Sequence, residues 1–446
     1  MDIKELAELL QEKGITGAGG AGFPTYAKLD KRADTIILNC AECEPLLKVH
    51  RQLLQSHAYE IMSALERVAN AVEATRIIIA LKESYQSTIE TVSSQLDSFP
   101  GIELKAMKER YPLGDEVVLI YEALGKVVPP GSLPIEAGVT VFNVETMYNI
   151  YLALNHREPV TDTYLTIAGE VKNPITVKVP IGMTVYETVE LAGGSLIKAP
   201  AYLMGGPMTG NIAGAYDTIT KTTNAILVLP ANHSVINKKR SNTAIDMKKA
   251  MAACCQCEMC TDLCPRHELG QPVAPHKFMR AATSGTTREI EPLLNIMFCC
   301  GCGVCEMYAC PQGLSPRKLI TEYKNGLRQN GVGIPKDVPL DKISPMREYR
   351  MIPMERLISR LGLKEYDAAA PLSDREVKPK QVKIKLSQHI GVPARPVVKK
   401  DAIVKKGDLI AVSREGVLSL PVHASIGGKV TEVNDNFVII REDIQV

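Results

Sequence analysis

The sequence predicts a multidomain α/β protein, and three observations lead to this fold class. A chain of 446 residues is too long for one ordinary domain. Short apolar runs alternate with helical sequence over residues 1–155, which predicts a Rossmann-like, mainly parallel sheet with helices on both faces. Ten of the twelve cysteines lie between Cys254 and Cys310, and sequence rich in valine, isoleucine and glycine occupies residues 381–446.

Composition and charge narrow the functional classes. Hydrophobic residues make up 45% of the chain and charged residues 23%, which is typical of folded globular proteins. The formal net charge is only +2, so the charge balance does not indicate nucleic acid or an anionic membrane as a partner. No apolar run approaches the roughly 18–20 residues that span a bilayer. The N-terminus, MDIKELAELLQ, is typical of an amphipathic helix and not of a secretory signal, so we expect a cytoplasmic protein.

The first predicted domain begins with that helix, in which Ile3, Leu6, Leu9 and Leu10 share one face. Further elements alternate along the chain. We predict strands at 35–38, 76–81 and 102–106, and helices at about 50–72 and 115–124.

A glycine-rich loop, GAGGAGFPT from Gly17 to Thr25, follows the first helix. Its glycines would let the backbone approach a phosphate or a flat ring closely. No predicted strand precedes the loop, so it does not fit the dinucleotide fingerprint, and no Gly-Lys-Ser/Thr ends it as in a Walker loop. A ligand-binding loop and a glycine-rich turn without a ligand both remain open at this point.

The segment Asn39-Cys40-Ala41-Glu42-Cys43-Glu44-Pro45 follows a predicted strand. Ligands of open α/β sheets bind at this carboxyl edge. Glu42 and Glu44 could bind ribose or ribityl hydroxyls there, and the alternative is an exposed polar loop.

The residue composition and the predicted secondary structure change after the first domain. Residues 161–235 contain two β-rich runs separated by Lys172-Asn173-Pro174, then a short helix that ends in glycines, which predicts a small ββαβ domain. Residues 331–380 carry six prolines and one amphipathic helix, MERLISRLGL, so we expect a surface linker. The pattern of residues 381–446 predicts a small all-β barrel or sandwich.

The cysteines form two runs. The first follows C-x2-C-x2-C-x3-C-P, the ligand spacing of bacterial [4Fe–4S] clusters, and the second repeats it with four residues in its last gap. Because the fourth cysteine of each run usually serves the other cluster, we predict two crossed ligand sets. The alternatives are two zinc sites or free thiols, and Cys255 and Cys300 fall off the spacing. The predicted sets are Cys254, Cys257, Cys260 and Cys310 for one cluster, and Cys264, Cys299, Cys302 and Cys305 for the other.

Four motifs resemble one known family in the same order. GAGGAGFPTYAK resembles the flavin loop of the FMN- and NADH-binding subunit of respiratory complex I. NCAECEP is similar to that family's second flavin/NADH loop, with Ala41 in place of an acidic residue. Gly114-Asp115-Glu116 stands where the family has Gly-Glu-Glu, and Asn143-Val144-Glu145-Thr146 matches its Asn-Val-Glu-Thr run.

This resemblance implies FMN and NADH as cofactors and positions for the residues that bind them. Lys28 is expected at the FMN phosphate, and Glu42, Glu44 and Glu116 at the flavin/nicotinamide pocket. Phe23 is expected either on the cofactor or in the core. No side chain is expected to act as a catalytic acid or base. The implied cofactor-binding residues are Gly17, Gly19, Gly20, Ala21, Phe23, Lys28, Asn39, Glu42, Glu44, Gly114, Glu116, Asn143 and Thr146.

The resemblance extends over nearly the whole chain. Residues 161–220 look like the β-grasp domain of the same family, and the C-terminal sequence resembles the barrel-sandwich domain of the Rnf complex C subunit. The order of the motifs is similar to that in the propanediol-utilisation cobalamin reductases of bacterial microcompartments. The implied domains are an FMN/NADH domain (1–160), a β-grasp domain (161–240), a helical two-cluster ferredoxin-like domain (241–330), a linker (331–380) and a barrel-sandwich hybrid domain (381–446).

The implied function is electron transfer from NADH through FMN and two [4Fe–4S] clusters to a corrinoid. A corrinoid or an adenosyltransferase would be the electron acceptor, a shell protein a possible partner, and the interior of a microcompartment the location. Two other hypotheses stay open: an Rnf C-like electron-input subunit of a membrane ion-pumping complex, and a non-catalytic electron relay or scaffold.

Overall fold

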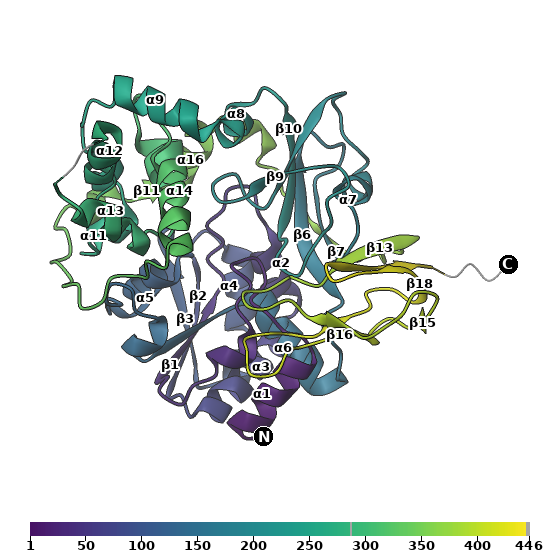
Figure 1. Ribbon diagram of the computed structural model, residues 1–446. Helices are drawn as coiled ribbons and strands as arrows, with labels where there is room; N and C mark the ends of the chain where they lie inside the picture. The colour runs from purple at the N-terminus through teal and green to yellow at the C-terminus, as the bar shows by residue number, and fades with distance from the viewer. Residues whose placement is uncertain (286–287, 443–446) are drawn as a thin grey trace.

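A four-stranded parallel sheet forms the centre of the N-terminal domain in the computed structural model, which describes residues 1–285 and 288–442. Its strands lie in the order β3–β2–β1–β5, with all neighbours parallel. Figure 1 shows this sheet and its helices beside a helical unit on one side and the C-terminal strands on the other. The strands are β1 (Thr35–Asn39), β2 (Arg76–Lys82), β3 (Ile102–Met107) and β5 (Val139–Asn143).

The two faces of the sheet bury alternate residues. Ile36 and Leu38 pack into one core, whereas Ile37 packs into a second core on the opposite face. This follows from the two-residue period of a strand, and apolar residues at successive positions are what a sheet covered on both faces requires. Helix α5 (Glu116–Leu124) covers the second core. The first core is covered by α1 (Ile3–Glu12), α2 (Val49–Ser56), α3 (Ala58–Val72) and α6 (Val144–His156).

The observed elements agree with the expected ones to within a residue or two, with one difference. The helical stretch expected at about 50–72 is two helices, α2 and α3. They are separated at His57, whose backbone leaves the helical region with φ −132° and ψ 40°. Strand β5 and helix α6, which were not predicted from the sequence, complete the domain.

The second domain is a six-stranded mixed sheet in the order β12–β7–β6–β10–β8–β9. The expected turn at Lys172–Pro174 lies between β6 (Asp162–Gly169) and β7 (Ile175–Pro180). Helix α7 (Val185–Leu191) begins with a capping box, in which Thr184 and Glu187 each accept a hydrogen bond from the other's backbone N–H. The remaining strands are β8 (Pro200–Met204), β9 (Asn211–Ala213) and β10 (Ala225–Pro230).

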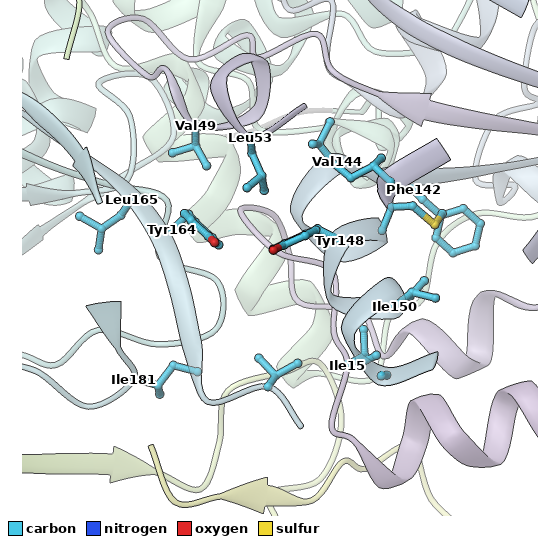
Figure 2. Close-up of a cluster of buried hydrophobic side chains, with 14 of the residues drawn as sticks. Ile15, Val49, Leu53, Phe142, Val144, Tyr148, Ile150, Tyr164, Leu165 and Ile181 are labelled. Atoms are coloured by element: carbon cyan, nitrogen blue, oxygen red, sulfur yellow. The ribbon is translucent and has the colours of Figure 1, made fainter. Parts of the chain in front are cut away.

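The first two domains share one hydrophobic core, which Figure 2 shows where α6 faces β6. Tyr148 and Tyr164 point toward each other across this junction, with ring centroids 6.3 Å apart. The buried Glu145 carboxylate accepts hydrogen bonds from the Thr163 hydroxyl at 3.0 Å and from the Tyr164 N–H at 2.9 Å. The two domains are therefore packed as one body.

The two cysteine runs lie in a helical unit. No strand occurs between residues 241 and 330 in the part that the structure describes. Phe278, Met279 and Ile320 are buried at the centre of this unit. Its longest helices are α9 (Thr243–Ala253), α12 (Pro275–Ser284) and α14 (Pro316–Gln329).

The segment expected to be a surface linker is paired with two sheets. Strand β11 (Ile352–Pro353) pairs with β4 (Arg110–Tyr111) of the first domain. Strand β12 (Leu372–Ser373) joins the second domain as the neighbour of β7. Helix α16 (Met354–Arg360) buries Leu357 and Ile358 in a core shared with β8 and β10. The segment therefore contributes to the packing of the folded body as well as connecting its ends.

The C-terminal domain consists of two sheets. One has the order β13–β19–β18–β15 and the other β14–β16–β17, and neither closes into a barrel within residues 1–285 and 288–442. The sandwich alternative is the observed one, while residues 443–446 of the predicted domain lie outside the described residues. None of the described helices is both long and apolar enough to cross a bilayer. The strands are β13 (Gln381–Lys385), β14 (Arg395–Pro396), β15 (Ile403–Val404), β16 (Leu409–Val412), β17 (Val422–His423), β18 (Gly428–Val433) and β19 (Phe437–Arg441).

Candidate functional site

A cavity of about 570 Å3 lies at the carboxyl ends of β1 and β5. This volume is in the range of sites that enclose a cofactor or another small ligand. All the residues expected to bind FMN and NADH line this space, and we call it the flavin-type cavity. They are Gly17, Gly19, Gly20, Ala21, Phe23, Lys28, Asn39, Glu42, Glu44, Gly114, Glu116, Asn143 and Thr146.

The glycine-rich loop forms one wall through its backbone. The Gly17 N–H donates to the Phe23 carbonyl at 2.9 Å, which closes the loop on itself. The Ala18 N–H donates to the Thr146 hydroxyl at 3.0 Å, which fastens the loop to the start of α6. Gly19 has φ +65° and Gly22 has φ +73°, a backbone conformation that side chains with a Cβ rarely adopt. The loop is thus a fixed backbone surface with little side-chain bulk.

A second loop closes the cavity at the end of β1. The Asn39 side chain donates to the Gly114 carbonyl at 3.1 Å and accepts from the Ala41 N–H at 3.0 Å. A Cβ at Gly114 would lie 2.6 Å from the Ala41 carbonyl oxygen and 3.1 Å from the Cys43 Sγ. Gly114 therefore permits the close packing of the two loops that line the cavity.

Glu42 is the carboxylate that best fits a ligand in the cavity. The residue is only 5% exposed, and its Oε1 has no hydrogen-bond partner in the described parts of the chain. The Thr25 Oγ1, also buried at the cavity wall, has none either. Buried polar atoms without partners are costly, so such atoms at a cavity wall indicate a ligand that supplies hydroxyl or N–H groups. A ribityl chain, as in FMN, has this chemistry.

Glu44 lies at the cavity wall, but its carboxylate is already bound by the second domain. It accepts hydrogen bonds from the Met208 N–H at 2.8 Å and the Thr209 N–H at 2.7 Å. A Cβ at Gly206 would lie 2.1 Å from the Glu44 Oε2, so the turn that holds this carboxylate requires glycine. Glu44 therefore joins two domains at the cavity, a contact that the sequence did not indicate.

Lys28 and Glu116 were expected at different parts of the ligand, but they form an ion pair. The Lys28 Nζ lies 2.8 Å from the Glu116 Oε1 and donates to the Val141 carbonyl at 3.1 Å. The lysine side chain is 25% exposed and the glutamate 43% exposed, so solvent reaches both. A phosphate at Lys28 would compete with Glu116 for the same ammonium group.

Several other residues line the cavity without having been singled out from the sequence, among them His50, Asn224 and Ile390. The His50 Nε2 lies 2.9 Å from the Asn143 Nδ2, and burial lowers the pKa of this imidazole, which favours its neutral form. Asn224 of the second domain donates to the Gly19 carbonyl at 3.3 Å. Ile390 of the C-terminal domain donates its N–H to the Gly22 carbonyl at 2.9 Å. Three domains thus complete one cavity.

The cysteines surround two small cavities in the crossed arrangement. The same cavities also contain the two off-spacing cysteines, Cys255 in the first and Cys300 in the second. Among the described residues, no three Cys, His, Asp or Glu side chains converge on the position of a single metal ion. The first cavity is lined by Cys254, Cys257, Cys260 and Cys310, and the second by Cys264, Cys299, Cys302 and Cys305.

The longer last gap of the second run has a local explanation. Its extra residue is contained in a π-helical turn, η5 (Cys305–Ala309), whereas the first run has an ordinary helical turn, α10 (Met259–Asp262). A π turn holds one residue more than an α turn and occurs often at functional sites. Cys310 therefore reaches the first cavity despite the inserted residue.

The electrostatics of the thiols fit an iron–sulfur ligand set. Burial, followed by the charges of Cys310, Cys254 and Cys257, raises the pKa of Cys260 to about 12. Four clustered thiolates repel one another unless a positively charged centre binds them, and four thiolates are the ligands of a [4Fe–4S] cluster.

The second cysteine cavity lies against the first domain. The Tyr111 hydroxyl donates to the Cys302 carbonyl at 2.5 Å. The Arg266 guanidinium lies 2.9 Å from the carboxylate of Asp115, the N-cap of α5. The first cysteine cavity is nearer the solvent, because Cys257 is exposed. The second cysteine cavity therefore contacts the domain that contains the flavin-type cavity, and the first is the more exposed of the two.

Comparison with family models divides the chain into four matches. Residues 10–152 match the Nuo51 FMN-binding domain, and residues 164–211 match the SLBB domain. Residues 253–315 match the 4Fe-4S dicluster domain, and residues 360–445 match the RnfC barrel sandwich hybrid domain.

Three relatives match this chain over more than half of its length. The cobalamin reductase PduS of Citrobacter freundii is 39% identical over 98% of this chain and 97% of the relative. The protein of the same name from Salmonella typhimurium is 38% identical over 99% of this chain and 97% of the relative. The C subunit of the Na+-translocating ferredoxin:NAD+ oxidoreductase complex of Acetobacterium woodii is 31% identical over 60% of this chain and 59% of the relative.

Proposed function

The chain belongs to the family of the cobalamin reductase PduS, as its motifs predict, and on this premise we propose that it transfers electrons from NADH to a corrinoid. The observation that carries this proposal is the spatial arrangement of the three sites. One set of four thiols contacts the domain that contains the cofactor-sized cavity, and the other set of four thiols is more exposed. This arrangement is what an electron-transfer flavoprotein needs between a buried donor and an acceptor at the surface.

The residues at the first site fit FMN. The backbone of the glycine-rich loop would face the flavin, the unpartnered Glu42 and Thr25 oxygens would accept from its hydroxyls, and Lys28 would bind its phosphate. When bound, FMN takes up a hydride from NADH, and the two [4Fe–4S] clusters pass electrons one at a time. The chain itself holds these groups and positions the domains around them.

The neutral His50 and the buried carboxylates suit this positioning role. His50 orients Asn143, whose side chain accepts from the Glu145 N–H at 2.8 Å and so caps α6. Glu44 joins the second domain to the cavity wall. We assign these residues to positioning and none to acid–base catalysis, since hydride and electron transfer require no proton donor on the chain.

We further propose the domain boundaries 1–160, 161–240, 241–330, 331–380 and 381–446, with β-grasp and ferredoxin-like identities for the second and third. The mixed sheet around α7 and the crossed cysteine sets support these assignments. A location inside a microcompartment, with an adenosyltransferase and a shell protein as partners, belongs to the same proposal. Family membership over nearly the full chain supports it.

An Rnf C-like role is the second candidate, because the C-terminal residues match the RnfC barrel sandwich model. The similarity to a subunit of an ion-translocating complex extends over only 60% of this chain, whereas that to PduS covers 98%. The PduS-like reductase is therefore favoured.

Anaerobic purification and cofactor loading test the proposed function. Iron, sulfide and FMN are counted, and NADH-driven reduction of aquacobalamin is then compared with that of ferricyanide. We expect about eight irons and one FMN per chain and reduction of both acceptors. Fewer than about four irons per chain would contradict the presence of two clusters. If the protein reduces ferricyanide but does not reduce aquacobalamin, a corrinoid is excluded as the acceptor.

A further inference from the structure

A groove of about 630 Å3 lies on the surface beside the first cysteine cavity. One wall comes from the cysteine runs, through Met259, Tyr308 and Pro311. The facing wall is the exposed side of α16, with Arg356 and Arg360. We call this space the α16 groove.

The groove adjoins the ligands of the more exposed cluster. Met259 immediately precedes Cys260, and Pro311 immediately follows Cys310, and both cysteines line the first cavity. Pro311 lines the groove and the cysteine cavity at once. A molecule in the groove would therefore lie next to the last electron carrier before solvent.

The wall formed by α16 is firmly held and carries free positive charge. Leu357 is completely buried and Ile358 nearly so, which fixes the helix against the core below. Arg356 and Arg360 are exposed, and neither has an ion-pair or side-chain hydrogen-bond partner among the described residues. Arginine binds phosphate through two parallel N–H groups and is weakly hydrated, so such a pair is suited to an anionic phosphodiester.

We propose that the α16 groove binds the corrinoid, with the corrin ring against Met259, Tyr308 and Pro311 and the phosphodiester of its nucleotide loop at Arg356 and Arg360. This inference rests on the proposed function, which names the corrinoid but not its site. Glu355 and Ser359 line the same wall and can hydrogen-bond the amide side chains of the ring.

The stoichiometry of the reaction suits a site of this kind. Oxidation of one NADH to NAD+ and a proton releases two electrons. These reduce two corrinoids from Co(III) to Co(II), one electron each. A shallow site open to solvent allows the first product to leave and the second substrate to enter between the two transfers.

Charge reversal at both arginines, Arg356→Glu with Arg360→Glu, tests the site. The matched control is Arg375→Glu with Arg395→Glu, two exposed arginines outside the groove. Bound FMN and iron are first measured in both variants, so that misfolding is detected independently of activity. Binding of aquacobalamin is then measured by equilibrium dialysis with the fully loaded protein, and its KM is measured with NADH as donor.

We expect the groove variant to bind aquacobalamin at least ten-fold more weakly and to show a raised KM, whereas the control variant matches the wild type. Diaquacobinamide, which lacks the nucleotide loop and its phosphate, provides a second arm. The wild type should prefer aquacobalamin over it, and the groove variant should lose this preference. The two arms together report on the phosphate contact itself.

The failures are distinguishable. If the wild type reduces aquacobalamin and the groove variant binds aquacobalamin with unchanged affinity, the corrinoid binds elsewhere on the protein. The proposed function would then still stand. If the wild type binds aquacobalamin and diaquacobinamide with equal affinity, a contact with the phosphate does not contribute to binding. A wild type that reduces ferricyanide but neither binds nor reduces aquacobalamin would overturn both proposals and indicate a protein acceptor.

Discussion

The guanidinium of Arg266 lies 2.9 Å from the carboxylate of Asp115 and thereby joins the first cysteine run to the flavin-type cavity. Arg266 follows Cys264 by two residues, and Asp115 lies between Gly114 and Glu116, which line that cavity. Both side chains are largely buried, with exposures of 17% and 14%. One ion pair thus holds the second cysteine cavity against the domain that would bind FMN.

Replacing Arg266 by Gln should lower the free energy of unfolding by about 3 kcal/mol, because it leaves the buried Asp115 carboxylate without its partner. Thermal unfolding of the loaded protein measures this change. Arg280→Gln, at an exposed arginine of α12, is the control and should change stability by less than about 0.5 kcal/mol. Equal effects of the two changes would show that the ion pair does not hold the domains together.

Replacing Gly114 by Ala should weaken FMN binding at least ten-fold. The new Cβ would lie 2.6 Å from the Ala41 carbonyl oxygen and would push the Asn39–Glu44 loop away from its position at the cavity. FMN retention after gel filtration and a fluorescence titration measure the effect.

Gly101→Ala is a matched control for this change, because a Cβ added at Gly101 would have no atom within 4 Å. It should retain FMN as the wild type does. Full retention of FMN by Gly114→Ala would mean that the loop tolerates displacement and that the close approach has no functional role.

Cys257→Ala and Cys302→Ala should each remove about half of the iron, because each cavity holds its own ligand set. Since Cys302 belongs to the set nearer the flavin-type cavity, its loss should also slow the reduction of the remaining cluster by NADH. Iron analysis and electron paramagnetic resonance of the reduced protein measure these effects.

The off-spacing cysteines are the controls for this prediction. Cys255→Ala and Cys300→Ala should keep the full iron content, although both thiols line the same cavities. Loss of a cluster from either control would show that an off-spacing thiol is a ligand.

Because Lys221 is buried, its titration should lower the free energy of unfolding as the pH falls from about 10 toward 7. Burial lowers the pKa of its ammonium group from 10.5 to about 7 in the folded protein. Between these values the unfolded chain binds more protons, so the free energy of unfolding rises with pH by at most about 1.4 kcal/mol per pH unit. Below pH 7 both states are protonated and this dependence ends.

Urea unfolding across this pH range measures the slope, and Lys221→Met should flatten it. Lys336→Met, at an exposed lysine, is the control and should leave the slope unchanged. The Lys221 ammonium donates to the Gly14 carbonyl at 2.7 Å and contacts the C-terminal domain at Pro421, so the methionine variant also loses these two interdomain contacts. An unaltered slope in Lys221→Met would mean that another group causes the pH dependence.

The sequence predicted best those features whose pattern lies within one short segment of the chain. The C-x2-C-x2-C spacing, the glycine loop and the strand that precedes Asn39 each lie within one short segment, and they predicted the cluster ligands and the parallel sheet. The one helix expected at 50–72 became two, because a change of direction at His57 depends on packing and leaves little trace in a periodic pattern. The linker was expected on the surface, since its two-residue strands are too short to show any alternation.

Residue types and their spacing alone indicated the chemistry of this protein: eight thiols at cluster spacing, glycines that bring backbone to a ligand, and carboxylates beside them. How these groups are used depends on contacts between segments that are distant in the chain. Glu44 binds the second domain, Lys28 pairs with Glu116, and Asn224 bonds to Gly19 at the cavity, 205 residues away in the chain. The reason is physical. The identity of a side chain determines what it can bind, but the packing of distant segments determines which partner comes within hydrogen-bonding distance.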